Sequence, residues 1–452
     1  MRKPPQPEAS PPLRIERIRL DGLFGHYHHD IPLMLADRVT LLHGPNGVGK
    51  TLTLSRIAAL LEGDYEALCD VPFERLELAY VGGERLAVEQ VPWPEGEDGE
   101  PWLDEDGDAV FYLRLMTPMG KALYCPQRWR SRAWQQTGVL SHEGITEQRG
   151  YTLSRQHLIA GWPSELSTPL YNGAVQEPVE LTQLRARTPV HFVPASRLYL
   201  STKAEIEAVY GYRTPDEPLV PRVLLVAREL VEAVNDADSD YAARSLALDA
   251  TLSRRIFSSP LPEPQPAEAL ANAAADVQRR QQRLRQLGLF DKLEPLEVDP
   301  IDFSDERRAM FSVVVDDWRQ KLAAFDALAE RLELLLEVLN RKLHPKRVTL
   351  DREAGYRAWD HTGAALDLEH LSSGEQHELV LLHTLLFDTP AGSLVLIDEP
   401  ELSLHVRWQS DFLPDLLRIT AMVRFDAVLA THSPYIVGDR DDLMVALRHP
   451  VP

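Results

Sequence analysis

The sequence has few cysteines, no long apolar run and no excess of positive charge. Its two cysteines, Cys69 and Cys125, are too few for a disulfide framework and lack paired metal-ligand spacing, so we expect a reduced, cytoplasmic setting. The proline-rich start, residues 1–12, has no apolar core typical of a signal peptide. No stretch approaches the roughly 18 apolar residues that cross a membrane, so we expect a soluble protein without a membrane partner. The net charge of -21 excludes nonspecific coating of DNA, and contact with DNA would require a local basic patch.

Hydrophobic patterns predict a chain in which strands and helices alternate at both ends and helices dominate the middle. Predicted strands cover residues 13–20, 27–33, 39–43, 76–81, 85–91, 110–115, 190–194, 393–397 and 426–430. A turn is expected between the first two, at Asp21 and Gly22. Predicted helices cover residues 50–61, 221–257, 268–287, 305–343 and 375–387, with Gly288 ending the third.

Leucines recur at alternating three- and four-residue steps in the last helix of the middle region. The members of this stripe are Phe325, Leu328, Leu332, Leu335 and Leu339. The stripe spans about two heptads, which is shorter than a coiled coil requires. It favours a helical insertion, and a short antiparallel hairpin is one form of it. The alternative is ordinary packing of this helix on the core.

A glycine-rich loop between a predicted strand and a predicted helix matches the pattern Gly-x-x-x-x-Gly-Lys-Thr. Its residues are Gly44, Pro45, Asn46, Gly47, Val48, Gly49, Lys50 and Thr51. Glycines allow backbone N–H groups to converge on phosphate oxygens, and the helix N-terminus adds its dipole. We expect Lys50 to reach the β- and γ-phosphates and the Thr51 hydroxyl to ligate Mg²⁺. The sequence therefore predicts a site for ATP and Mg²⁺.

Two acidic residues follow a buried apolar strand, as expected for the partner of such a loop. Residues 394–397 are apolar, and Asp398 and Glu399 come directly after them. Asp398 at the strand end can hold magnesium through water. Glu399 is placed to polarise the attacking water as a general base. The buried strand before this pair and Pro400 after it distinguish it from the charged pairs that are common on protein surfaces.

The segment 371–376, Leu-Ser-Ser-Gly-Glu-Gln, places two serines and a glycine just before a helix. By itself, a serine and Glu375 in this arrangement indicate an N-terminal capping box without a ligand. Together with the two preceding motifs, the segment resembles the Leu-Ser-Gly-Gly-Gln signature of ABC ATPases. Ser373 replaces the first glycine and Glu375 precedes the final glutamine, as in the SMC, RecF and OLD branch. The resemblance implies that Ser372, Ser373, Gly374 and Glu375 contact nucleotide held by a second copy, in an ATP-dependent dimer or higher homo-oligomer.

The segment 430–434, Ala-Thr-His-Ser-Pro, completes this motif set in the expected order. The resemblance implies that His432 is the switch histidine that senses the γ-phosphate and acts with Glu399. It also implies that residues 401–405, starting at Glu401, form the dimer-contacting loop. Gln127 and Gln176 are both candidates for the glutamine-loop residue.

The resemblance implies an α/β fold of the ABC type. It consists of a P-loop nucleotide-binding domain with a mixed sheet core, an antiparallel β-subdomain and a helical insertion. Residues 1–200 are expected to hold the N-terminal half of the ATPase domain, with the loop and the β-subdomain. Residues 201–345 are expected to be the insertion, and residues 346–452 the C-terminal half, with the signature, the acidic strand and His432.

Residues 370–434 are similar to stand-alone ATPases of anti-phage systems, of the PARIS and Septu types, which work with a separate nuclease-type effector. The few residues after His432 leave no room for the catalytic domain that OLD nucleases carry there. We therefore expect an ATP-hydrolysing sensor and scaffold that controls such an effector in anti-phage defence. The alternative is a RecF-like repair ATPase that binds DNA. A transporter ATPase is disfavoured because the insertion is too long.

Three further clusters carry weaker predictions. His26, His28, His29 and Asp30 could ligate a metal, but a structural or surface role is favoured because no second ligand cluster pairs with them. A basic and aromatic patch could contact nucleic acid, or be the surface of the β-subdomain or a protein-binding site. It consists of Lys121, Arg128, Trp129, Arg130, Arg132 and Trp134. A third group is expected to be a solvated helix face. It consists of Arg279, Arg280, Arg283 and Arg285.

Overall fold

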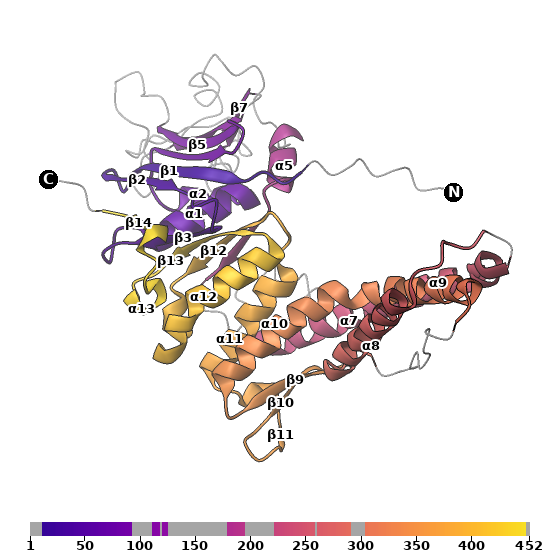
Figure 1. Cartoon of the computed structure of the whole chain (residues 1–452). Helices are drawn as coiled ribbons and strands as arrows, with labels where there is room; N and C mark the ends of the chain where they lie inside the picture. Colours follow the sequence, from indigo (N-terminus) through magenta and orange to yellow (C-terminus); the bar gives the residue numbers. More distant parts are fainter. Residues whose placement is uncertain are drawn as a thin grey trace, which may run out of the picture. The chain divides into compact units, whose positions relative to one another are not determined.

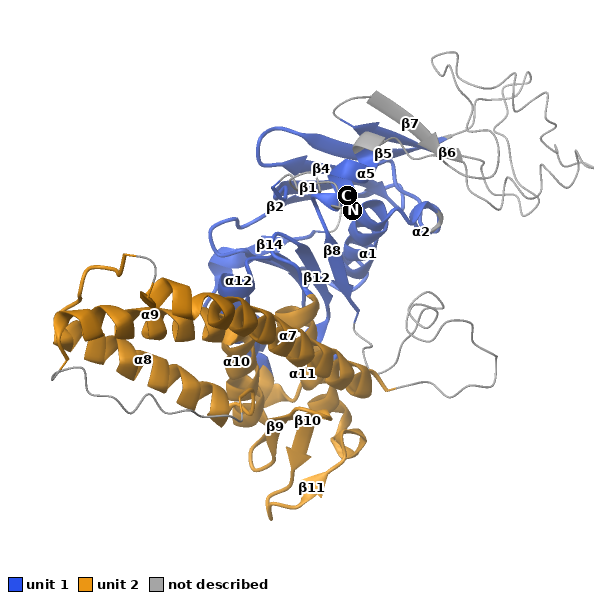
Figure 2. Cartoon of the chain, turned by 90° about the vertical axis from the view of Figure 1, so that its right-hand side faces the viewer, with its two compact units in different colours: residues 1–195, 389–402, 409–452 blue, residues 196–388, 403–408 orange. Residues whose placement is uncertain are grey.

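The structure, a computed structural model, describes residues 11–92, 111–117, 120–124, 179–194, 221–257, 260–290 and 303–448. The chain forms two compact units, shown in Figure 2. Unit 1 comprises residues 1–195, 389–402 and 409–452, and unit 2 comprises residues 196–388 and 403–408. Residues 346–388 group with the helices of unit 2.

Unit 1 contains a six-stranded antiparallel sheet with the order β2-β1-β4-β5-β6-β7. The strands are β1 (Ile15–Leu23), β2 (Tyr27–Pro32), β4 (Arg75–Tyr80), β5 (Arg85–Pro92), β6 (Phe111–Thr117) and β7 (Gly120–Tyr124). The expected turn at Asp21 and Gly22 is wrong, because β1 continues to Leu23 with a bulge in its pairing to β2. The chain turns instead at Phe24 and Gly25, both with positive φ.

A five-stranded parallel sheet with the order β14-β3-β13-β12-β8 lies below the antiparallel one in Figure 1. The strands are β3 (Val39–His43), β8 (Val190–Val193), β12 (Leu394–Asp398), β13 (Asp426–Ala430) and β14 (Met444–Ala446). Strands β12 and β13 are buried along their whole length, as predicted from their uninterrupted apolar runs. Because the sheet is parallel, the segments that follow β3, β12 and β13 leave from one edge.

Helix α1 (Lys50–Glu62) lies between the two sheets of unit 1 (Figure 1), and its buried side chains join one hydrophobic core with both of them. The smaller elements of unit 1 are α2 (Tyr65–Cys69), α5 (Val179–Ala186), α12 (Val406–Val423), which begins in unit 2, α13 (Pro434–Val437) and short 3-10 helices at Pro400–Ser403 and Asp441–Leu443. This packing fixes the first turn of α1 at the edge of the parallel sheet.

Unit 2 is built mainly from helices. They are α7 (Arg222–Phe257), α8 (Ala267–Gln286), α9 (Asp305–Leu322), α10 (Asp326–Leu343) and α11 (Ser373–His383), which continues into a π-helical turn at Thr384–Asp388. A small antiparallel sheet contains β9 (Arg347–Asp351), β10 (Gly355–Trp359) and β11 (Ala365–Leu366), and a 3-10 turn covers Leu368–His370. Gly288 follows α8 with φ of 78° and closes it, as predicted.

The helical segment expected at residues 305–343 is present, with a 3-10 turn at Ala323–Phe325 between α9 and α10. The five residues of the apolar stripe are all buried. Helix α10 packs on α7, α11 and β9, while α9 packs on both α7 and α8. The stripe is therefore the buried face of α10 within unit 2, which agrees with the expected helical insertion.

The expected α/β fold class is confirmed: a P-loop domain with a parallel sheet, an antiparallel β-subdomain and a helical insertion. Among the described helices, none is long and apolar enough to cross a membrane.

Candidate functional site

The phosphate loop connects the end of β3 to the first turn of α1 in unit 1, as its sequence predicts. Gly47 and Gly49 have φ of 82° and 89°, a region that side-chain-bearing residues rarely adopt. Space is also restricted at two positions. A Cβ on Gly49 would lie 2.5 Å from a methyl carbon of Leu23, and one on Gly44 would lie 2.6 Å from the carbonyl oxygen of Leu447. The loop therefore requires glycine at 44 for packing, at 47 for conformation and at 49 for both.

The Lys50 side chain is buried and lies against its own loop. Its ammonium donates to the carbonyl oxygens of Gly44 at 2.9 Å and Pro45 at 3.1 Å. Burial lowers the pKa of Lys50, and nearby carboxylates, first that of Glu399, oppose this shift. An ammonium has three N–H groups, so one remains to donate to a phosphate oxygen.

Thr51 and Asp398 meet at the edge of the parallel sheet. The Thr51 hydroxyl donates to Asp398 Oδ1 at 3.0 Å, although the two residues are 347 positions apart in the chain. Thr51 is exposed, whereas Asp398 is buried at the end of β12. A hydroxyl and a carboxylate oxygen in contact form the type of oxygen pair that Mg²⁺ prefers beside phosphates.

Glu399 follows Asp398 with an unusual backbone conformation. Its φ is 41°, and its N–H donates to the carbonyl oxygen of Ala430 at 2.9 Å. The side chain is 28% exposed, and Oε1 lies 3.9 Å from His432 Nε2. Glu399 and His432 therefore come together at the ends of β12 and β13, and both reach solvent.

Glu401 holds the segment that carries His432. Its carboxylate accepts hydrogen bonds from the Thr431 hydroxyl at 3.0 Å and from the His432 N–H at 2.6 Å. Thr431 is also tied to β3, because its N–H donates to the carbonyl oxygen of Leu42. The sequence analysis placed Glu401 in a dimer-contacting loop and missed this positioning role within its own chain. The only signal in the sequence was a glutamate shortly after the acidic pair.

His28, His29 and Asp30 of the histidine cluster lie on β2 and have the structural or surface roles that the sequence analysis favoured. His29 is buried under the phosphate loop, and its Nε2 donates to the carbonyl oxygen of Val48 at 2.8 Å. Burial lowers the pKa of His29, which therefore supports the loop as a neutral side chain. His28 contacts Asp21 at 3.1 Å, and Asp30 pairs with Arg17.

The signature segment begins α11 in unit 2. The predicted capping box is present: Ser372 Oγ accepts from the Glu375 N–H, and Glu375 accepts from the Ser372 N–H at 2.7 Å. Lys346 donates to both oxygens of Glu375. Burial acts against ionisation of Glu375, but the bonds from Lys346 and Ser372 outweigh it and hold its pKa below the usual value. The carboxylate of Glu375 thus has partners inside unit 2, whereas Ser373 is exposed and Gly374 half-buried. A nucleotide contact by this segment stays a prediction.

Several expected residues lie outside the described part of the chain. They are Gln127, Gln176, Arg128, Trp129, Arg130, Arg132, Trp134 and the side chain of Lys121. The expected solvated arginine face of α8 needs correction. Arg280 and Arg283 form ion pairs with Asp326 and Glu333 of α10, so these two arginines join two helices.

Comparison with known proteins gives one family and several structures. The family described as "AAA domain, putative AbiEii toxin, Type IV TA system" matches residues 210–438, just over half of the chain. The matched region contains the signature, the acidic pair and His432, and it begins after the phosphate loop. No curated protein matches the chain.

Among solved structures, the chain is similar to the Smc head domain with an extended coiled coil bound to the C-terminal domain of ScpA, from Pyrococcus furiosus. That match has 15% identity and a TM-score of 0.37, and it covers 97% of this chain and 95% of that one. The Smc head domain from Thermotoga maritima matches with 10% identity and a TM-score of 0.33, covering 96% and 94% of the two chains.

Proposed function

The chain belongs to the AAA-domain family described as "putative AbiEii toxin, Type IV TA system", and from this premise we propose that it binds ATP with Mg²⁺ and hydrolyses it in unit 1. One contact carries the proposal. The Thr51 hydroxyl at the start of α1 meets the Asp398 carboxylate at the end of β12 at 3.0 Å. The phosphate loop and the acidic strand each have other uses in proteins. Their convergence on one oxygen pair is what a nucleotide site requires.

Each residue of the site has a distinct task in this proposal. Backbone N–H groups of the loop and the remaining N–H of Lys50 hold the β- and γ-phosphates. Thr51 and Asp398 would hold Mg²⁺, which neutralises charge on the phosphates when it is bound. Glu399 accepts a proton from the attacking water, and His432 beside it donates to the γ-phosphate.

Steady-state ATPase activity with and without Mg²⁺ tests this assignment. Glu399→Gln should lower kcat by about two to four orders of magnitude, the range for loss of a general base, and leave ATP binding intact. Lys50→Ala should abolish tight binding of a fluorescent nucleotide. Glu16→Gln is the matched control, because Glu16 is an exposed glutamate on β1 of the same unit. Unchanged turnover in Glu399→Gln would remove Glu399 from the role of base.

We further propose that two copies close on ATP through the signature segment. The exposed Ser373 at the start of α11 supports this, together with the resemblance of residues 371–376 to the ABC signature. Light scattering of the Glu399→Gln variant should show a monomer without nucleotide and a dimer or larger assembly with ATP and Mg²⁺. Adding Ser373→Arg should keep ATP binding and prevent assembly, whereas Ser239→Arg, on an exposed face of α7, should not. Assembly that survives Ser373→Arg would refute the signature contact.

The finer proposal concerns what the ATPase controls. We propose a sensor and scaffold that regulates a separate nuclease-type effector in anti-phage defence. The motifs in residues 370–434 support it, and so does a family whose description names a toxin of a Type IV TA system. Co-expression with the product of the adjacent gene should give a complex whose stability differs between Lys50→Ala and Glu399→Gln. A well-folded chain that forms no such complex in any nucleotide state would contradict the proposal.

A further inference from the structure

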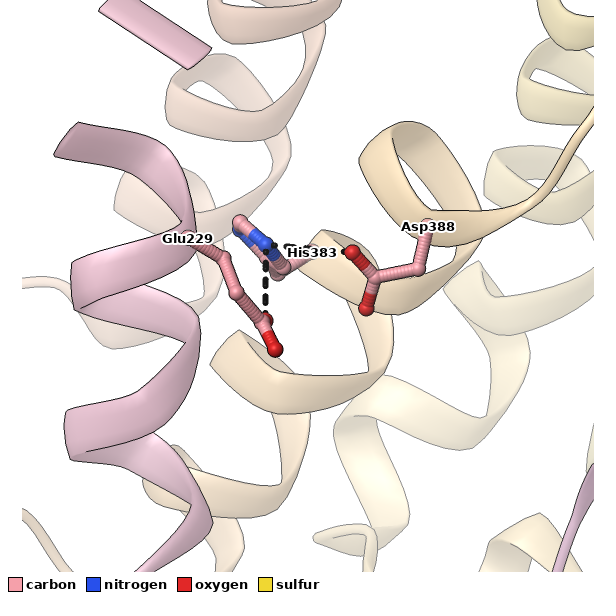
Figure 3. A group of neighbouring side chains, drawn as sticks. All are labelled: Glu229, His383 and Asp388. Carbon is pink, nitrogen blue, oxygen red and sulfur yellow. Dashed lines mark ion pairs between the residues drawn. The ribbon is translucent and has the colours of Figure 1, made fainter. Parts of the chain in front are cut away.

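A histidine and two carboxylates converge inside unit 2, apart from the nucleotide site (Figure 3). Glu229 comes from α7, His383 ends α11, and Asp388 ends the π-helical turn that follows it. His383 Nε2 lies 3.4 Å from Glu229 Oε2 and 3.6 Å from Asp388 Oδ1. All three groups offer ligand atoms within 4.8 Å of one another. Figure 3 shows the imidazole between the two carboxylates.

Two of the atoms that face each other in this cluster, His383 Nε2 and Glu229 Oε2, are buried and lack hydrogen bonds. The His383 side chain is 1% exposed, and its Nε2 has no hydrogen-bond partner in the structure. Glu229 Oε2, which faces His383 Nε2, is likewise buried without a hydrogen bond, and so is Asp388 Oδ2, the carboxylate oxygen on the side of Arg222. The other ring nitrogen of His383, Nδ1, is 2.7 Å from the hydroxyl of the buried Tyr356. When Nδ1 donates its proton to that hydroxyl, Nε2 presents a lone pair to the two carboxylates.

Three electron-rich atoms facing each other in a buried space require a cation between them. A proton on Nε2 is one choice, but 3.4 and 3.6 Å exceed the roughly 2.7–3.2 Å of a normal N–H···O bond. Two ligand atoms about 2.1 Å from a tetrahedral ion are about 3.4 Å apart, which fits the cluster better. The nearest described positive charge is Arg222, at 3.8 Å from Asp388 Oδ2.

The backbone is shaped to complete this group of ligands. Residues five apart in an α-helix point in different directions, so Asp388 would turn away from His383 if α11 continued regularly. The π-helical turn Thr384–Asp388 has hydrogen bonds from i to i+5 and returns Asp388 to the side of His383. Such single π-turns are frequent at functional sites.

We propose that Glu229, His383 and Asp388 bind one divalent transition-metal ion, with zinc as the class that one imidazole and two carboxylates fit best. Tyr356 orients the imidazole from the second nitrogen, as outer-shell partners of metal-bound histidines do. The ion joins α7 to the end of α11. Because the signature segment begins α11, the ion fixes the helix that presents Ser373.

Zinc titration of the metal-stripped full chain, without nucleotide, tests the proposal. Isothermal titration calorimetry with ZnCl₂ should give one tight site per chain, and Co²⁺ should give the visible absorption of a four-coordinate site. Asp388→Asn and Glu229→Gln keep the side-chain size. Each should weaken zinc binding by more than the about 10- to 100-fold that loss of an outer-shell partner causes. Zinc should raise the Tm of the wild type and not that of either variant.

Two matched controls separate this cluster from other carboxylates. His370 lies 3.6 Å from Asp367 in an exposed pair with the same groups and spacing, so His370→Gln should bind zinc like the wild type. Asp398→Asn removes the carboxylate of the nucleotide site and should also leave zinc binding unchanged. Loss of binding in Asp398→Asn, or full binding in Asp388→Asn and Glu229→Gln, would overturn the proposal.

The result is decisive even if a variant fails to fold. Glu229 and Asp388 are 37% and 24% exposed, so their isosteric variants disturb packing least, and circular dichroism checks their fold. If both variants unfold, the wild type alone decides. A zinc-dependent rise in Tm with a four-coordinate Co²⁺ spectrum supports the metal. Absence of both means that the cluster is a protonated histidine between two carboxylates.

Discussion

Lys342 of α10 and Glu378 of α11 form an ion pair in the interior of unit 2. Lys342 Nζ donates to Glu378 Oε1 at 2.5 Å, and the two side chains are 1% and 0% exposed. Removing one member of such a pair leaves a buried charge without compensation and costs about 3–5 kcal/mol. Replacing both members by apolar residues of similar volume is often neutral. The pair therefore predicts strong non-additivity.

The structure also predicts which single substitution is worse. The second oxygen of Glu378, Oε2, is buried without a hydrogen bond, so Lys342 is the main compensation for this carboxylate. Lys342 has a further interaction besides Glu378. Lys342→Met should therefore lie at the upper end of the 3–5 kcal/mol range and Glu378→Leu at the lower end. For a unit of this size, about 3–5 kcal/mol corresponds to a fall in Tm of about 6–20 °C.

Thermal and urea unfolding of the full chain, followed by circular dichroism, would measure these changes. The double variant Lys342→Met/Glu378→Leu should recover most of the stability that either single variant loses. Lys346→Met is a suitable control, because Lys346 pairs with Glu375 at a half-exposed position of the same unit. The reasoning is refuted if Lys342→Met costs less than about 1 kcal/mol, or if the two single effects simply add.

Three further predictions concern the loop, the switch segment and the signature. Gly47→Ala should destabilise unit 1 by about 1–2 kcal/mol, because alanine is strained at positive φ. Gly49→Ala should cost more, because of these two positions only Gly49 also lacks space for a Cβ. Urea unfolding measures both changes. Glu401→Gln should lower ATPase kcat about tenfold, the scale of one weakened hydrogen bond, with unchanged ATP affinity by fluorescence titration. The pKa of Glu375 is lower in the folded state than in the unfolded state. The stability that this carboxylate contributes is therefore fully present above its unfolded-state pKa and is lost as the pH falls through its folded-state pKa. Acid titration of unfolding should therefore be less steep for Glu375→Gln below about pH 4.5.

The sequence could predict the centre of the nucleotide site because its parts are local. The run 394–397 is buried on both faces of a strand, and an apolar run of that length before Asp398 indicates such a strand. The loop 44–51 needs only a strand before it and a helix after it, and both are present. Parallel pairing then brings the strand ends to one edge, which follows from the topology and from no single residue.

Positions decided by contacts with distant residues could not be predicted. Asp21 and Gly22 have the composition of a turn, yet they stay in β1: Asp21 pairs with Arg75 of β4, and the pairing with β2 resumes at Leu23 after a bulge. Residues 323–325 lie inside a continuous helical pattern, but the helix tightens there to a 3-10 turn between α9, which packs on α7 and α8, and α10, which packs on α7, α11 and β9. Glu401 resembles any surface glutamate until Thr431 and His432 are brought to it by β13.

Helix α11 combines both situations. The apolar side chains of α11 and of the residues after it, up to 387, predict a buried helix. The polar side chains of Glu378 and His383 are fully buried in it as well. A buried carboxylate and a buried imidazole each require a partner, so the sequence indicates that partners exist without naming them. They come from two helices, Lys342 on α10 and Glu229 on α7. Because rotation of α11 about its axis would separate both pairs, we infer that these polar contacts select one orientation of the helix. Leucines alone would tolerate several orientations, and the signature at the start of α11 would then lack a defined direction.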